Sequence, residues 1–211
     1  SPFKGGLNRP QVQWIDYDMD TDMDLFLLDE NGYIQYYENV GSVSQALFRL
    51  RDTQFQDIYA KGWFYFLDFD LDGDMELVTQ SDEWLIHMSY YENNGGTFSF
   101  QNFLFLDDGA YIGIDSATKP TFIDIDQDGD LDLFSGNSVG TVSFFENVGL
   151  NGNQPLYKWI TDTWEDLSIV STPLNQSSRH GASYLQFFDD NADGVSDLYW
   201  GDYYYQSVYV I

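Results

Sequence analysis

The sequence predicts an all-β fold made of repeated, four-stranded antiparallel sheets. Aromatic residues make up 18% of the 211 residues and glycine is frequent, a bias typical of half-buried strands joined by tight turns. A nine-residue loop rich in aspartate occurs four times. Each copy lies between two short apolar runs of strand length, which favours one sheet for each copy of the loop.

The loops are separated by similar lengths of chain. They occupy residues 16–24, 68–76, 124–132 and 189–197, so that their first residues lie 52, 56 and 65 positions apart. These intervals suit a structural repeat of somewhat over 50 residues. We expect repeats at about 10–58, 62–115, 118–170 and 183–211, within a single domain or domain fragment that spans 1–211.

A first and a second strand flank each loop. A large aromatic residue precedes each loop by two positions, an apolar residue directly precedes it, and a leucine directly follows it, as in Phe66, Leu67 and Leu77. The aromatic residues are expected to pack one repeat on the next; they are Trp14, Phe66, Phe122 and Phe187.

Two further strands complete each predicted unit. A third strand closed by an Asn/Gly turn is indicated at 36–41, 90–95 and 144–149, and a fourth near 98–100 and 157–160. Four antiparallel strands of this kind form the blade of a β-propeller. A single blade cannot bury both of its faces, so the blades are expected to stack around an axis.

The loops have the composition of a calcium site. Acids at positions 1, 3 and 5 bring side-chain oxygens toward one point, and glycine at position 6 allows a reversal that adds a carbonyl at position 7 and a carboxylate at position 9. Oxygen ligands in this number favour Ca²⁺ over Mg²⁺, and up to four Ca²⁺ ions are predicted. The candidate ligands are Asp16, Asp18, Asp20, Asp22, Asp24, Asp68, Asp70, Asp72, Asp74, Glu76, Asp124, Asp126, Asp128, Asp130, Asp132, Asp189, Asn191, Asp193, Val195 and Asp197.

Two other interpretations of these loops fit the sequence less well. An EF-hand shares the first six positions but requires glutamate at position 12, where this chain has Leu27, Thr79, Ser135 and Trp200. A metal-free acidic turn is opposed by charge, because 19 of the 35 acids lie within the four loops and would repel one another.

These units resemble FG-GAP/VCBS repeats, the blades of integrin-α-like propellers found in many secreted bacterial proteins. The resemblance implies ligand roles for the five acids of the second loop and of the third. It also implies that position 7 ligates through its carbonyl, so that Asp74 and Asp130 need not use their side chains. Thr21 replaces the expected glycine and is predicted to distort the first loop, whereas Asn191 and Val195 are tolerable in the fourth.

The charge of the chain limits its partners. Its 35 acids and 8 basic residues give a formal net charge of −27, which disfavours binding to nucleic acid or to anionic lipid. Cysteine is absent, which excludes disulfides and thiolate sites. No stretch approaches the roughly 20 apolar residues that span a bilayer.

The fourth repeat runs through 209–211 without a fourth strand. Either residues 1–8 supply that strand and close a four-bladed ring, or the chain is part of a larger propeller. Both possibilities stay open at this stage.

Several motifs suggest chemistry but have simpler explanations. The sequence 136–140 matches a Gly-x-Ser-x-Gly elbow yet joins two predicted strands. His87 and His180 have no repeated partner, and 175–177 is a lone glycosylation sequon. The insertion 150–183 could present a patch for sugar or protein, formed by Tyr157, Trp159, Trp164, Arg179 and His180.

The function expected from these features is a non-catalytic, calcium-stabilised binding or scaffold module, secreted or on the cell surface, that meets a protein or glycan partner. The alternatives are a propeller lectin and the accessory domain of a larger secreted enzyme. No catalytic or organic cofactor residues are predicted.

Overall fold

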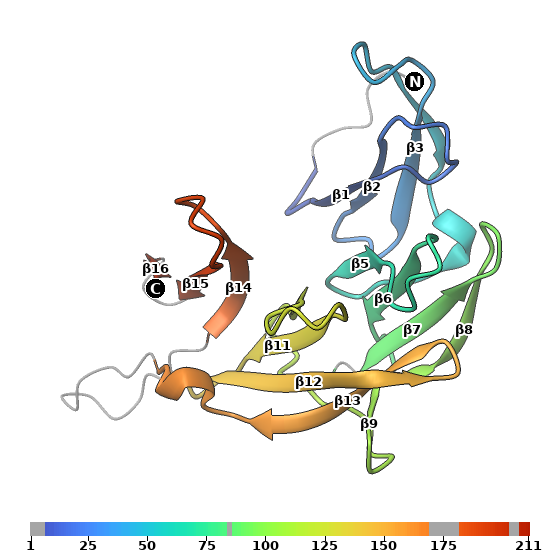
Figure 1. Cartoon of the computed structure of the whole chain (residues 1–211). Helices are drawn as coiled ribbons and strands as arrows, with labels where there is room; N and C mark the ends of the chain where they lie inside the picture. The colour runs from blue at the N-terminus through green and yellow to red at the C-terminus, as the bar shows by residue number, and fades with distance from the viewer. Residues whose placement is uncertain (1–6, 84–85, 169–181, 203–206) are drawn as a thin grey trace. The chain divides into compact units, whose positions relative to one another are not determined.

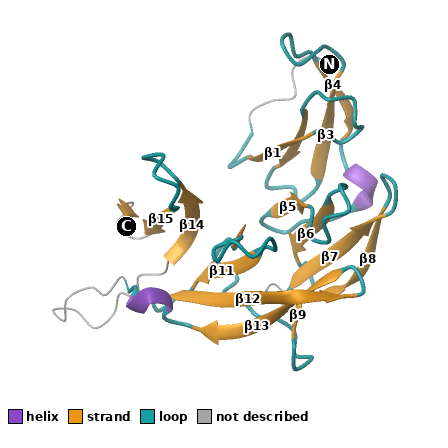
Figure 2. Ribbon diagram, in the orientation of Figure 1, coloured by secondary structure: helices purple, strands orange, loops and turns teal. Residues whose placement is uncertain are grey.

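The computed structural model describes residues 7–83, 86–168, 182–202 and 207–211 (Figure 1). Within these ranges the structure is all-β, and its helical residues are confined to the 3-10 turns Phe55–Asp57 (η1) and Trp164–Asp166 (η2) (Figure 2). Four sheets of the propeller-blade type are present, which confirms the predicted fold class. No helix in this part of the chain has the length and apolar character needed to cross a membrane.

The chain divides into two compact units, Ser1–Phe103 and Leu104–Ile211. The first unit holds two four-stranded antiparallel sheets in which each strand pairs with the next along the chain. One consists of β1 (Gln11–Ile15), β2 (Asp24–Leu28), β3 (Ile34–Asn39) and β4 (Phe48–Asp52). The other consists of β5 (Phe64–Leu67), β6 (Glu76–Gln80), β7 (Met88–Asn93) and β8 (Phe98–Phe103). These meanders are the first two predicted blades.

The second unit departs from the four-strand pattern. Its first sheet has the order β10 (Thr121–Ile123), β11 (Asp132–Gly136), β12 (Val142–Asn151), β13 (Gln154–Thr161) and β9 (Phe105–Leu106), and β9 pairs with β13 in parallel. Its second sheet has three strands among the described residues: β14 (Ala182–Phe188), β15 (Asp197–Asp202) and β16 (Ser207–Val210). Residues 1–6 lie outside the described ranges, so their proposed pairing stays a prediction.

The strand register places every acidic loop at the same point of its blade. The residue before the loop pairs with the ninth loop residue in each case, as Ile15 does with Asp24 and Leu67 with Glu76. The same pairing joins Ile123 to Asp132 and Phe188 to Asp197. Each loop therefore connects the first strand to the second, as the repeat predicts.

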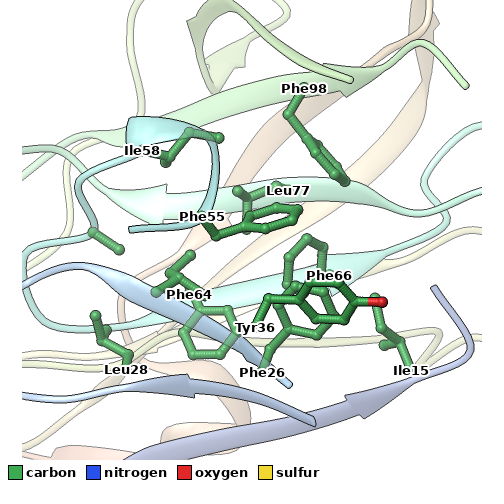
Figure 3. Close-up of a cluster of buried hydrophobic side chains, with 12 residues drawn as sticks. Ile15, Phe26, Leu28, Tyr36, Phe55, Ile58, Phe64, Phe66, Leu77 and Phe98 are labelled. Atoms are coloured by element: carbon green, nitrogen blue, oxygen red, sulfur yellow. The ribbon is translucent and has the colours of Figure 1, made fainter. Parts of the chain in front are cut away.

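Aromatic side chains pack the two blades of the first unit together (Figure 3). The ring centroids of Phe26 in β2 and Phe66 in β5 lie 4.6 Å apart, and Phe55 of η1 lies 5.0 Å from Phe26. In the second unit, Phe134 of β11 lies 4.9 Å from Phe187 of β14. Burial of such rings supplies most of the stabilisation that a small sheet cannot provide alone.

The predicted packing role of the aromatic residues before the loops holds in only part of the chain. Phe66 and Phe187 are buried against the preceding blade of their own unit, whereas Trp14 is 50% exposed and packs beside Phe48. Trp14 lies in the first blade of its unit, and its predicted packing on another blade stays a prediction. Phe122, in the first blade of the other unit, is likewise only partly buried.

Candidate metal centres

Backbone amides hold the first loop residue in the same way in all four loops. The N–H of position 6 donates to the Oδ2 atom of the aspartate at position 1 in each copy. The distances are 3.0 Å for Thr21 to Asp16, 3.2 Å for Gly73 to Asp68, 3.1 Å for Gly129 to Asp124 and 2.9 Å for Gly194 to Asp189. The four loops therefore share one backbone conformation as well as one sequence pattern.

Positions 3 and 5 are fixed by similar hydrogen bonds. The N–H of position 5 donates to Oδ1 of position 3, and the N–H of position 7 donates to Oδ1 of position 5. Each aspartate among these side chains keeps a second oxygen that these bonds do not use, whereas the single oxygen of Asn191 is occupied by the Asp193 N–H. The loop thus arranges several acids around one point before any ion binds.

Three of the loops bring carboxylate oxygens within 4.8 Å of one another. Asp16, Asp18 and Asp20 form such a group in the first loop, and Asp124, Asp126 and Asp128 form one in the third. In the second loop Glu76 joins both Asp68 with Asp70 and Asp72 with Asp74. The fourth loop has no comparable group of acids among the described residues, since Asn191 stands at its third position.

Buried carboxylate oxygens without a hydrogen-bond partner occur at two loop positions. They are Oδ1 of Asp16 and Asp68 at position 1, and Oδ1 of Asp22, Asp74 and Asp130 at position 7. Burying an unpaired charged oxygen is costly, and a cation in the loop would satisfy it. The donor set consists of oxygen alone, which fits Ca²⁺. The resemblance implied that position 7 ligates through its carbonyl and need not use its side chain, and the buried oxygens show that the side chain is also available to an ion.

The acid at position 9 has a different environment from the others. Asp24 is buried and accepts hydrogen bonds from the Asn39 N–H at 2.7 Å and from the Tyr36 hydroxyl at 3.1 Å. Asp132 accepts the Asn147 N–H at 2.8 Å and Glu76 accepts the Phe69 N–H at 2.9 Å. The ninth acid therefore ties the loop to the blade, and its predicted ligand role stays a prediction.

Burial and neighbouring charge raise the pKa of several loop acids. Burial, followed by the charges of Asp128 and Asp132, raises the pKa of Asp130 to about 7. Burial raises the pKa of Asp132 to about 6 although backbone N–H groups oppose the shift. Burial is also the main cause of the raised pKa of Glu76. These shifts mark the loops as places where the metal-free chain carries unfavourable negative charge.

The metal-free chain should become more stable as pH falls from 8 toward 5. The folded pKa values of Asp130 and Asp132 lie above their unfolded values, so the folded state binds more protons in this window and loses that stabilisation as pH rises through about 6 to 7. Thermal melts of protein freed of metal by a chelating resin test this expectation. A melting temperature that falls between pH 8 and pH 5.5 would contradict it.

Thr21 keeps the turn that its position requires. Its φ angle is 80°, close to the 88–104° of Gly73, Gly129 and Gly194, and its N–H makes the same hydrogen bond to Asp16. The expectation that threonine distorts this loop was therefore wrong. The backbone conformation is preserved, and the cost is the strain of a β-branched residue in the left-handed region.

Replacing Thr21 by glycine should relieve this strain. Relief of the strain is partly offset, because glycine gives the unfolded chain more conformational entropy. We expect Thr21→Gly to stabilise the protein by about 1 kcal/mol net, which raises the melting temperature by roughly 2–4 °C. Gly129→Thr is the matched control and should destabilise. A Cβ atom there meets no atom within 4 Å, so the expected cost comes from its φ of 104°. Equal melting temperatures for both variants and the parent would contradict the strain argument.

The other candidate sites do not assemble a catalytic group in the described residues. Residues 137–140 form the turn between β11 and β12, where the Gly140 N–H donates to the Asn137 carbonyl at 3.0 Å. This confirms that the Gly-x-Ser-x-Gly match is a hairpin turn. His87 lies just before β7 with its ring 5.4 Å from that of Phe103.

The patch predicted on the insertion 150–183 does not form as expected. Tyr157 is fully buried, and Trp164 packs against the core of the second unit. Trp159 alone of these three is largely exposed, with its indole N–H donating to Asp162 at 3.2 Å. Arg179, His180 and the sequon at 175–177 lie outside the described residues.

The blades and their acidic loops together define a repeat protein of the β-propeller type. Residues 68–135, from the start of the second loop to β11, match the family model described as an FG-GAP-like repeat. This segment is therefore an FG-GAP-like repeat, as its loops suggested. Comparison with curated protein sequences finds no match.

Proposed function

We propose that this chain is a calcium-stabilised, non-catalytic binding or scaffold module that works outside the cell or on its surface. The buried, unpartnered oxygens at loop positions 1 and 7 carry the calcium part of the proposal, because two loops repeat the oxygen at position 1 and three loops repeat the one at position 7. Ca²⁺ at the millimolar concentrations found outside cells fills even weak sites of this kind.

The residues proposed to hold the ions follow from the same geometry. In the second loop they are Asp68, Asp70, Asp72, Asp74 and Glu76, and in the first and third loops the acids at positions 1, 3, 5 and 7. The fourth loop offers fewer acids and is proposed to bind most weakly. The bound ion supplies positive charge and fixes the loop, and the residues of the chain do no bond chemistry there.

The proposal assigns the repeated acids to ion binding, which gives the chain a binding role rather than an enzymatic one. FG-GAP-like repeats usually serve as non-catalytic modules, which agrees with this assignment. The partner is proposed to be a protein or a glycan at the cell surface. A glycan array probed in the presence of calcium separates the lectin alternative from a protein scaffold.

Calorimetric titration of the metal-free chain with CaCl₂, and with MgCl₂ in parallel, tests the proposal. We expect saturable calcium binding at three or more sites and weaker magnesium binding, since Mg²⁺ requires a tighter octahedral site. Absence of calcium heats, or equal affinity for both ions, would overturn the assignment.

A further inference from the structure

A second candidate site lies in the first unit, away from the acidic loops. A cavity of about 670 Å³ opens between the segment 56–59, which follows β4, and strands β7 and β8. Its volume is in the range typical of small-ligand sites. Four aromatic rings, those of Tyr59, Tyr91, Phe100 and Phe103, supply much of its wall.

Hydrogen bonds between the Gln56 side chain and backbone groups hold one wall of this cavity in place. Gln56 of η1 accepts the Phe98 N–H at 2.9 Å and donates to the Gly96 carbonyl at 2.8 Å, which fixes the segment 56–59 to β8. The rings of Tyr91 and Phe100 meet edge to face at 5.6 Å. Because these contacts fix the walls of the cavity without a ligand, binding does not have to spend free energy on ordering them.

The lining combines these rings with negative charge. Asp57, Asp82 and Glu83 line the cavity, and none of its lining residues is lysine or arginine. Phe100 is 52% exposed although it is a large apolar residue. Exposed aromatic faces beside carboxylates attract a cation through the ring quadrupole and through direct charge.

One ammonium group of the chain already occupies part of this environment. The Nζ atom of Lys61 lies 5.8 Å from the centre of the Tyr59 ring and 3.9 Å from Oδ1 of Asp82, two residues that line the cavity. Lys61 itself is not a lining residue. Its position shows that this pair of side chains accepts an ammonium group, and that Lys61 would compete with a cation entering from outside.

The third blade has a hollow in the equivalent place, with different chemistry. Its volume is about 270 Å³, and Ser143 and Phe145 stand there where the larger cavity has Ser89 and Tyr91. Among the described residues, Phe145 is the one aromatic residue that lines it. The blade architecture therefore produces a hollow here, and the aromatic residues of β8 with the acids at 82 and 83 distinguish the larger one.

We propose that the cavity of the first unit binds an organic cation, an ammonium or guanidinium group carried on an apolar stem. The stem packs against Tyr91, Phe100 and Phe103, and the charged group lies between the Tyr59 ring and Asp82. The same chemistry is presented by a free alkyl diamine and by a lysine or arginine side chain of a protein partner. The proposal does not depend on calcium binding by the loops.

Nuclear magnetic resonance of the full chain in saturating calcium tests this site. The probes are 1,5-diaminopentane and the blocked tripeptides Gly-Lys-Gly and Gly-Arg-Gly, with blocked Gly-Gln-Gly as the neutral control. We expect the charged probes to shift the aromatic signals of Tyr91 and Phe100 in a saturable way, and Gly-Gln-Gly to leave them unchanged. A dissociation constant tenfold lower for a tripeptide than for the diamine would identify a protein side chain as the ligand. The reverse would identify a free amine.

Four variants give the test its controls. Asp82→Asn and Phe100→Ala should each weaken binding by about 3- to 10-fold, through lost charge and lost cation–π contact. Lys61→Gln should tighten it by a similar factor, because a competing ammonium group is removed. Trp159→Ala, which removes a surface ring of matching exposure on β13, should have no effect. Equal shifts with the glutamine peptide, or affinities that none of the first three substitutions alters, would overturn the proposal.

Discussion

Removal of calcium should lower the melting temperature of this protein by well over 10 °C. Four ions with two charges each change the formal net charge of −27 to −19 and neutralise it where the acids are most crowded. Each site adds about 2.7 kcal/mol at a hundredfold excess of calcium over its dissociation constant. Because 1 kcal/mol shifts the melting temperature of a domain of this size by roughly 2–4 °C, a few sites suffice for the expected effect.

Calorimetric melts in excess calcium and in excess chelator at pH 7.5 measure this effect. Sodium chloride added to the chelated sample is the control, since screening by salt relieves general repulsion without filling the loops. We expect salt to recover only a small part of the lost stability. An unchanged melt in chelator would refute a structural role for the ion, and full recovery by salt would reduce that role to screening.

The sequence predicted the repeat well because its signals are local. The loop acids, the turn glycines and the leucines after each loop are properties of short segments, and the register that pairs Leu67 with Glu76 follows directly from them. The strand β9 was missed because it has only two residues, which pair in parallel with β13. Two residues are too few to show the alternation of apolar and polar side chains that predicts a strand.

Other features depend on contacts that no short segment encodes. Trp14 and Phe66 occupy equivalent positions in their repeats, yet Phe66 is buried in the core cluster of the first unit and Trp14 is 50% exposed. The cavity of the first unit was missed for a related reason. Its aromatic residues are of the type expected in strand packing, and no local pattern marks the ones that line a cavity.

The acid at position 9 shows the same limit of sequence-based prediction within the candidate metal centres. Aspartate there was predicted as a ligand on its spacing, yet spacing alone cannot distinguish an oxygen that faces an ion from one that accepts two buried donors. Both oxygens of Asp24 accept hydrogen bonds, from the Asn39 N–H and the Tyr36 hydroxyl, and its ligand role stays a prediction. Asp18 of the same loop makes one weak bond, to the Asp20 N–H at 3.3 Å, and keeps its other oxygen available.

These two aspartates should respond differently to the same substitution. Asp24→Asn replaces one acceptor oxygen by an amide N–H₂ group, so a buried donor loses its partner at a cost of about 1–3 kcal/mol, with or without calcium. Asp18→Asn keeps the acceptor that Asp20 needs, as Asn191 does in the fourth loop at 2.9 Å. It should therefore leave the metal-free melting temperature unchanged or slightly raised, because a like charge is removed, and lower the melting temperature only when calcium is present.

Both variants remove one negative charge from one loop, so each serves as the control for the other. Melts of the parent and the two variants, in calcium and after metal removal, give six melting temperatures that separate a structural acid from a ligand. We expect the loss in Asp24→Asn to persist without metal and the loss in Asp18→Asn to disappear. A metal-free melt of Asp24→Asn equal to that of the parent would show that its buried hydrogen bonds do not stabilise the blade. An Asp18→Asn chain that is destabilised equally in both conditions would show that this carboxylate supports the fold rather than an ion.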